Sequence, residues 1–244
     1  MIDWLRRERQ NPTVTVGGRE LPLAIRRHPR ARRLTMRLAP DGSEVRVTLP
    51  QWGRTMDALV FAGKRVEWLE RQLAAVPRAA PPAPGGSIAW RGERLAIEWQ
   101  PVLPRRPQLA PGRLRLGGPE DTLVPRVRRW LEAEALRLMG EDLADYCARA
   151  GLAVPRLRLS RAVRRWGSCS GPKDGGHCIR LNWRLVQAPD AVRRSVVAHE
   201  VAHLVHFDHS PAFRALLAEL FEGDLAQADG WLRREGRTLY AAFG

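Results

Sequence analysis

The chain has 244 residues, 44% of them hydrophobic and 27% charged, which is the composition of a globular protein that can bury a sizeable core. Its formal net charge of +15 would attract nucleic acid or another anionic surface. No run approaches the roughly 18 apolar residues that a membrane span needs, so we expect no membrane partner.

The first ten residues, MIDWLRRERQ, contain charges but lack the apolar segment of a secretory signal. The three cysteines, Cys147, Cys169 and Cys178, are too few and too irregularly spaced for a disulfide scaffold. We therefore expect a cytoplasmic protein.

Arginine dominates the basic residues: only Lys64 and Lys173 are lysines, so 39 of the 41 are arginine. A GC-rich genome produces the same bias, in which case the arginines form a solvated surface without a dedicated partner. If instead they form a groove, aromatic residues near that groove, such as Trp52 or Trp90, would stack on unpaired bases. The sequence leaves DNA as a possible partner.

The first half of the chain is predicted to consist mainly of strands. Residues 13–49 predict two hairpins, around Gly17-Gly18 and Asp41-Gly42. The spacing of apolar residues predicts a helix over 55–75. The proline-rich segment 76–86 predicts a linker, which a hairpin over 87–99 and a strand over 112–118 follow. We place a domain boundary near Gly117-Gly118, with a β-rich region containing one helix over 1–118 and a second domain over 119–244.

The second half is predicted to have the order helix, hairpin, helix, helix, helix. The first helix covers 122–150 and ends at Gly151. The segments 156–170 and 177–186 predict a β-hairpin closed by the glycine-rich GPKDGG. Further helices are predicted over 188–207, from Ser210-Pro211 onward, and over 224–240. Together the two halves predict an α+β protein.

The helix over 188–207 contains the motif H-E-x-x-H. His199 and His203 are four residues apart, so they share one helical face with Cβ atoms about 5–6 Å apart, and two imidazoles so placed can bind one Zn²⁺ ion. Glu200 is placed to take a proton from a zinc-bound water. A dication close by would also offset the cost of burying this carboxylate in an apolar helix.

The third ligand has several candidates. His206 shares the helical face but lies about 10.5 Å along the axis from His199, a turn too far from the metal. His209 reaches the metal only if the chain turns after His206, and the segment FDHSP favours such a turn. We predict His209 as the third ligand, with Glu219 or Glu222 of the following helix as the alternative.

Two other interpretations concern the same residue types. A lone H-E-x-x-H arises by chance, in which case both histidines are core residues and Glu200 pairs with an arginine. A second metal site formed by Cys169, His177 and Cys178 is one such interpretation. The spacing of these three residues fits no standard zinc pattern. Small buried core thiols are the alternative.

Three motifs in order, RRWGSCS, IRLNWRLV and VVAHEVAHLVHFDHSPAF, resemble those of the YgjP-like, SprT-related zinc metallopeptidases. The resemblance extends to RRLTMRL and GRLRLGG and so covers most of the chain. It implies a zincin-like second domain, His199, His203 and His209 as zinc ligands, Glu200 as the catalytic acid/base, and a protein or peptide substrate. The SprT-like branch includes peptidases that digest proteins crosslinked to DNA, which does not establish that substrate for the YgjP-like branch. The spacing also resembles that of metzincins, but His206 stands where those have glycine.

The RWGSCS segment predicts a strand beside the metal helix. Such a strand can bind an extended peptide by edge pairing, and Gly167 permits close backbone approach; tight packing of the hairpin on the helix is the alternative. Trp166 and Trp183 are expected to anchor the hairpin in the core. Three residues are candidates to polarise a substrate carbonyl, without a choice among them: Arg165, Arg180 and Asn182.

The sequence thus predicts a zinc-dependent peptidase. The alternative from another class is a nucleic-acid-associated protein with a mainly structural zinc, and a zinc hydrolase of non-peptide amides is a third. Three protein ligands favour catalysis, whereas a fourth would favour a structural site.

Overall fold

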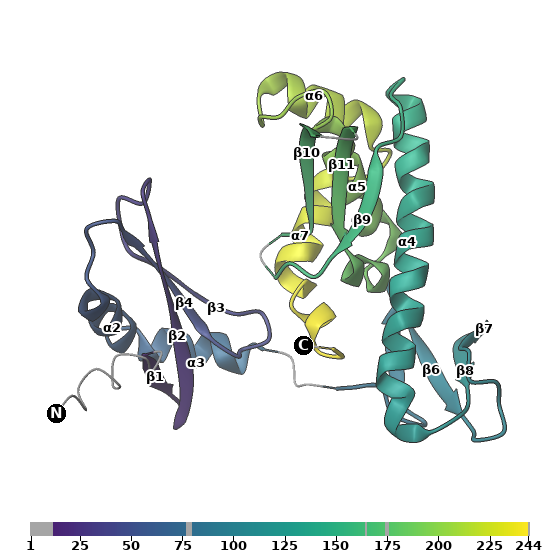
Figure 1. Ribbon diagram of the computed structural model, residues 1–244, viewed down its shortest axis with the longest axis horizontal. Coiled ribbons are helices and arrows are strands. Elements are labelled where there is room, and N and C mark those ends of the chain that lie inside the picture. Colours follow the sequence, from purple (N-terminus) through teal and green to yellow (C-terminus); the bar gives the residue numbers. More distant parts are fainter. Residues whose placement is uncertain (1–11, 77–79, 164, 174–175, 244) are drawn as a thin grey trace. The chain divides into compact units, whose positions relative to one another are not determined.

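The computed structural model describes residues 12–76, 80–163, 165–173 and 176–243 (Figure 1). The N-terminal decapeptide and residues 174–175 of the GPKDGG loop lie outside these ranges. The chain divides into two compact units, Met1–Arg78 (unit 1) and Ala79–Gly244 (unit 2).

Within residues 12–76, unit 1 consists of a four-stranded sheet and two helices. The sheet has the order β1-β2-β4-β3 and contains both predicted hairpins, β1–β2 and β3–β4. The single helix predicted over 55–75 is two helices, because the first ends at Gly63 and glycine is a poor helix former. The elements are β1 (Thr13–Val16), β2 (Arg19–His28), β3 (Thr35–Leu38), β4 (Val45–Pro50), α2 (Thr55–Gly63) and α3 (Val66–Ala74).

The described residues of unit 2 form two sheets and four α-helices. The first sheet has the order β5-β6-β8-β7 and the second the order β10-β11-β9. The strands are β5 (Ser87–Trp90), β6 (Glu93–Trp99), β7 (Gln108–Ala110), β8 (Arg113–Leu116), β9 (Arg156–Ser160), β10 (Gly167–Lys173) and β11 (Gly176–Asn182). The helices are α4 (Leu123–Arg149), α5 (Asp190–Ala202), α6 (Pro211–Leu220) and α7 (Leu225–Glu235), with short 3-10 helices at Glu120–Thr122, Trp183–Gln187 and Thr238–Tyr240.

The first sheet of unit 2 belongs with the C-terminal helices. Its buried Ile97, Leu114 and Leu116 share one core with Leu123 and Val127 of α4. The two compact units divide at Arg78–Ala79, and Gly117-Gly118 lies inside unit 2. The turn signal at the two glycines is real, but the apolar face of the sheet before it is buried by the helix after it.

The second sheet and α4 surround the helix of the H-E-x-x-H motif. α5 contacts α4 on one side and β10 and β11 on another (Figure 1). β10 and β11 form the predicted hairpin, and β9 adds to it in parallel with β11. Residues 183–187 form a 3-10 helix where the sequence predicted strand, with Trp183 fully buried as expected. The predicted α+β class is confirmed.

Among the described residues, no helix is long and apolar enough to cross a membrane.

Candidate metal centre

The helix α5 is anchored to α4 just before its motif begins. Arg193 of α5 pairs with Asp142 of α4 at 2.7 Å, and both side chains are at most 5% exposed. Arg194 pairs with the same carboxylate at 3.0 Å and with Asp145 at 2.7 Å. The attraction within such buried pairs is largely offset by desolvation, so we assign them mainly an orienting role. They fix the rotation of α5 about its axis and hence the direction of His199.

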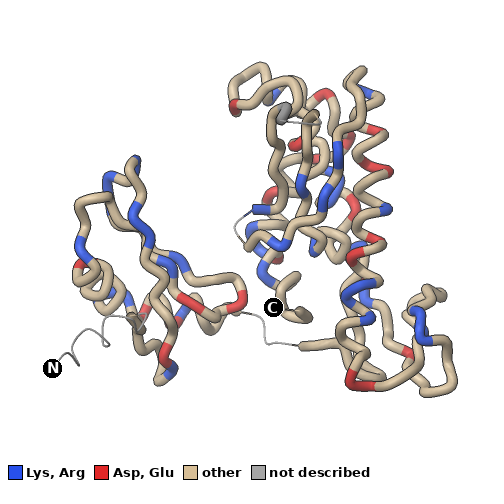
Figure 2. Tube along the Cα trace, in the orientation of Figure 1, with Lys and Arg blue, Asp and Glu red and all other residues tan. Residues whose placement is uncertain are grey.

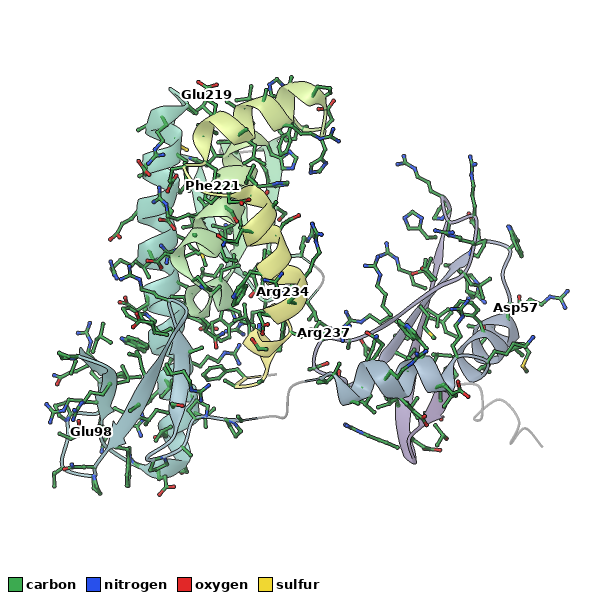
Figure 3. All side chains as sticks on the ribbon, turned by 180° about the vertical axis from the view of Figure 1, so that it is seen from behind. Asp57, Glu98, Glu219, Phe221, Arg234 and Arg237 are labelled. Carbon is green, nitrogen blue, oxygen red and sulfur yellow. The ribbon has the colours of Figure 1, made fainter. Side chains whose placement is uncertain are left out.

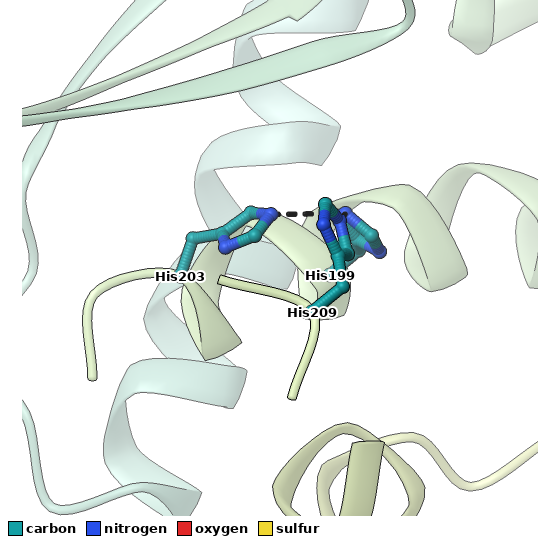
Figure 4. Close-up of side chains that lie close together, drawn as sticks. All are labelled: His199, His203 and His209. Carbon is teal, nitrogen blue, oxygen red and sulfur yellow. Dashed lines mark hydrogen bonds between the residues drawn. The ribbon is translucent and has the colours of Figure 1, made fainter. Parts of the chain in front are cut away.

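Three histidines converge at the C-terminal end of α5 (Figure 4). The Nε2 atoms of His199 and His203 are 3.1 Å apart, and those of His199 and His209 are 3.3 Å apart. Ligands about 2.0–2.1 Å from a tetrahedral zinc ion lie roughly 3.3–3.4 Å from one another. The donor set and its spacing therefore fit zinc.

His209 reaches this cluster because the helix stops early. The sequence predicted a helix as far as Phe207 and a turn after His206. α5 instead ends at Ala202, with His203 as its C-cap, and the turn covers residues 203–208. The backbone N–H of Ser210 donates to Asp208 at 3.2 Å, and Ser210 in turn caps α6 by accepting from the N–H of Phe213. These two local hydrogen bonds turn the chain so that His209 points back toward α5.

Phe213 is the common support of the three imidazole rings. Its ring centroid lies 5.0 Å from that of His199, 4.5 Å from that of His203 and 4.9 Å from that of His209. Phe213 is only 2% exposed, so its position is fixed by the core. The sequence predicts a helix from Ser210-Pro211 onward but does not indicate a role for Phe213 at the metal site. Its place three residues after the cap of α6 was the available signal.

The protonation of the histidines suits metal binding. The carbonyl of His206 lies 2.9 Å from Nδ1 of His203, which must donate the proton and so leaves a lone pair on Nε2. His206 thus contributes through its backbone, and its ring is outside the cluster. Burial, together with the charges of His203 and His209, lowers the pKa of His199 to about 4, which keeps its ring in the neutral, metal-binding form at pH 7.

Glu200 is buried beside the cluster, with 5% of its surface exposed. Burial raises the pKa of its carboxyl group to about 7, against a hydrogen bond from the backbone of Cys169 and the positive charge of Arg165, which both lower it. Within the described part of the chain, its Oε2 atom has no hydrogen-bond partner. A buried carboxylate oxygen without a partner is costly, and a nearby cation or a polarised water would offset that cost.

Gly167 lies directly against this carboxylate. A Cβ atom at position 167 would be 2.4 Å from Oε1 of Glu200 and 2.7 Å from its Cδ. The first residue of β10 must therefore be glycine for the strand to pass this close to α5. This close approach is to α5, and it matches the alternative of tight packing between the hairpin and the helix.

A cavity of about 560 Å³ opens beside Glu200 and His199. It lies between α5, α6, α7 and the start of β10, and His199 and Glu200 of the motif line it. Its walls are mostly apolar: Val196, Leu217, Leu225 and Leu232.

The two carboxylates considered as alternative ligands lie elsewhere. Glu219 is exposed on α6, and Figure 3 shows it at the outer surface of the helix. Glu222 accepts hydrogen bonds from Tyr146 at 2.8 Å and from Arg149 at 3.1 Å, and it also pairs with Arg194. Among the described residues, the group that could hold a metal is His199, His203 and His209.

The three candidates for polarising a substrate carbonyl differ in their burial and in their contacts. Asn182 is fully buried, and its side chain donates to the carbonyl of Ala162 and accepts from the backbone of Arg184. Its role is therefore structural. Arg180 lies exposed on β11, opposite Ser168. Arg165 is also exposed, and its charge lowers the pKa of Glu200.

The cysteines of the hairpin lie on opposite faces of the sheet. Cys169 is opposite Ile179, whereas Cys178, next along β11, is opposite Ser170. Successive strand residues point to opposite faces, so the two thiols do not share a metal. Burial raises the pKa of Cys169 to about 11, with further contributions from Glu200 and Cys178.

An H-E-x-x-H helix with a third histidine converging from the next turn, and with a buried glutamate against a neighbouring strand, defines a site of the metallopeptidase class. The comparison with protein families agrees with this geometry. The YgjP-like metallopeptidase domain matches residues 32–235, and the chain belongs to this family.

A curated relative, the methionyl-tRNA formyltransferase of Streptomyces coelicolor, is 38% identical over 86 residues. The match covers 34% of this chain and 28% of that enzyme. The chain thus spans under a third of this relative's length, and the formyltransferase activity is not carried over. No solved structure matches the chain.

Proposed function

We propose that this protein is a zinc-dependent peptidase with His199, His203 and His209 as metal ligands and Glu200 as the general base. The observation that carries the proposal is the convergence of three Nε2 atoms, with neighbouring pairs 3.1 and 3.3 Å apart. The described residues offer three ligands in this group, and an open fourth position favours catalysis over a structural role.

A bound zinc ion would supply Lewis acidity, which activates water and polarises the scissile carbonyl. Glu200 follows His199 directly on the same helix, so its carboxylate lies beside the metal site. From there it accepts the proton of the attacking water and passes it to the leaving amine. Gly167 and the backbone N–H of Cys169 hold that carboxylate in place. Phe213 and the carbonyl of His206 orient the imidazoles.

The substrate would bind as an extended peptide along β10. This strand is at the edge of its sheet, and Gly167 brings its first residue into contact with the catalytic Glu200. Edge pairing supplies affinity through main-chain hydrogen bonds, while a neighbouring pocket supplies specificity. The apolar cavity beside His199 would take an apolar side chain next to the scissile bond.

Cytoplasmic action is part of the same proposal. Cys147, Cys169 and Cys178 are all free thiols, as is usual in a reducing compartment.

The test compares zinc-loaded wild-type protein with Glu200→Gln on a panel of unfolded protein substrates, with products identified by mass spectrometry. Glutamine keeps the shape of the side chain but cannot accept the proton, so we expect hydrolysis to fall by about 10²–10⁴-fold with zinc retained. Undiminished proteolysis by Glu200→Gln would contradict the proposed mechanism. Parallel reactions with single-stranded DNA show whether a nucleic acid changes the rate.

A further inference from the structure

The basic charge of the chain is concentrated in unit 1. Residues 1–78 contain 16 Lys or Arg and 8 Asp or Glu, whereas residues 79–244 contain 25 and 18. Unit 1 thus has slightly more than half of the excess positive charge in about a third of the length. Between Leu21 and Pro40 there are six arginines and no carboxylate, all six exposed: Arg26, Arg27, Arg30, Arg32, Arg33 and Arg37. Figure 2 shows this basic segment along β2 and the loop that follows it.

The two units also differ in how their arginines are neutralised. In unit 2, ten arginines form ion pairs with carboxylates. Within the described part of unit 1, such pairing is confined to Arg46, which contacts Glu44 at 2.6 Å. A compositional bias toward arginine affects both units alike. The exposed arginines of residues 21–40, for which no carboxylate partner lies within the described part of unit 1, therefore need another explanation.

The sheet topology places the loop arginines, Arg30, Arg32 and Arg33, at one end of unit 1. β2 and β3 lie on either side of β4, so the loop over 29–34 crosses the end of β4, where His28 is level with Pro50. The turn after β4 is at the same end, and its Trp52 is 77% exposed. Arg27 fastens this turn by donating to the carbonyl of Gly53 and to Oγ1 of Thr55, each at 3.1 Å.

A cavity of about 280 Å³ lies beside the arginine loop, between β3 and the two helices. Phe61 and Trp68 line it together with Arg33 and Arg65. The guanidinium of Arg65 lies 4.7 Å from the centroid of the Phe61 ring. The volume is just below the roughly 300–1,000 Å³ of small-molecule pockets, so it has room for one ring system and not for a folded partner. Aromatic faces with guanidinium groups beside them are the combination on which unpaired bases stack.

We propose that this end of unit 1, the loop over 29–34 with the cavity of Phe61 and Trp68, is a binding site for single-stranded nucleic acid. Arg30, Arg32 and Arg33 contact successive phosphates, and one base enters the cavity. The phosphate contacts carry no sequence information, so binding is largely independent of sequence. Single strands are preferred over duplex because paired bases cannot enter the cavity. The site is independent of the peptidase proposed above.

The experiment measures binding of the full chain to a fluorescent oligothymidylate of about 20 nucleotides, by anisotropy at about 50 and 200 mM salt. With about five phosphates neutralised and a slope of about −0.7 per phosphate, affinity should fall roughly a hundredfold over this range. The triple variant Arg30→Ala, Arg32→Ala, Arg33→Ala should bind at least tenfold more weakly, and its slope should be smaller by about 2.

A matched control removes the same charge from unit 2. Arg105, Arg106 and Arg129 are exposed and line a different cavity, of about 670 Å³, so their triple alanine variant should keep most of the affinity. Trp68→Leu keeps an apolar side chain but removes the stacking surface. It should weaken oligothymidylate binding by about 5- to 150-fold and leave heparin binding unchanged.

The other outcomes would overturn the proposal. If the unit 2 triple abolishes binding and the loop triple does not, the site is in unit 2. Equal affinity for duplex, heparin and single strand would show that charge alone is recognised. Binding to anionic phospholipid vesicles without binding to the oligonucleotide would make the surface a membrane contact. Unchanged zinc content in each variant shows that the metal centre is intact.

Discussion

Gly167 and Glu200 are in contact where β10 crosses α5, and this contact leaves no space for a side chain at position 167. A Cβ atom there would lie 2.4 Å from Oε1 and 2.7 Å from Cγ of Glu200. Real Cβ atoms do not approach so closely, so a larger residue must move the carboxylate. The position of the proposed general base is therefore set by a neighbouring strand as well as by its own helix.

Gly167→Ala should reduce peptide hydrolysis and leave the metal in place. The added methyl group displaces the Glu200 carboxylate, and a misplacement of about 1 Å can cost about 10²-fold in rate. We expect kcat to fall by ten- to a hundredfold, with zinc content unchanged by elemental analysis. Gly140→Ala is the control, because a Cβ atom there meets nothing within 4 Å. Full activity in Gly167→Ala would mean that this contact does not position the base.

Alanine substitutions distinguish the three proposed metal ligands from the nearby His206 by their effect on zinc content. His199→Ala, His203→Ala and His209→Ala should each lose zinc, because each removes one of the converging Nε2 atoms. His206→Ala should retain nearly all of it, since only the His206 carbonyl touches the cluster. Elemental analysis after dialysis decides between them. Zinc loss in His206→Ala with full zinc in His209→Ala would reverse the assignment.

The geometry of this cluster was largely predictable from local rules. Four-residue spacing puts His199 and His203 on one face, and the turn signals in FDHSP bring His209 back. The roles of Gly167 and Phe213 in the cluster were harder to predict. Their contacts with the motif depend on how a strand about 30 residues earlier and the following helix pack against α5, and spacing within one element does not determine that packing.

The fold was predictable where signals are local and less so where they are not. Both hairpins of unit 1 follow from glycine turns with alternating strands on either side. Gly117 and Gly118 mark a turn, but Leu116 before it and Leu123 after it are buried in one core, so a turn signal alone does not locate the division between compact units. Residues 183–187 were predicted as strand from their apolar character, yet Asn182 caps them into a 3-10 helix by accepting from the N–H of Arg184.

Narrowing the cavity beside Glu200 should change substrate preference more than it changes zinc binding. Ala226 is an exposed residue that lines this cavity, and Ala226→Phe would fill part of it. We expect kcat/KM to fall by about 10- to 200-fold for peptides with a large apolar residue at the scissile bond, and less for alanine or glycine there. Ala133→Phe is the control, because Ala133 lines the separate cavity of Arg129. An equal loss for all peptides would argue against a specificity pocket.

The carboxylate of Glu222 should make the stability of unit 2 depend on acid pH. Burial raises its pKa, but hydrogen bonds from Arg194, its own backbone and Tyr146 outweigh this and hold the value at about 2. A depressed pKa stabilises the folded state above the unfolded value of about 4.3, and this contribution is lost as pH falls from about 4.3 to 2. Because the carboxylate is partly exposed, the gain at pH 7 should be only about 0.5–1 kcal/mol.

Glu222→Gln therefore should lower the free energy of unfolding by about 0.5–1 kcal/mol at pH 7, and the difference from wild type should vanish near pH 2. Denaturant titrations followed by circular dichroism at several pH values measure this, with a chelator present so that release of metal in acid does not contribute. Glu219→Gln removes the same charge from an exposed position on α6 and should have little effect. A Glu222→Gln deficit that stays constant down to pH 2 would show that lost packing, and not the ion pair with Arg194, is responsible.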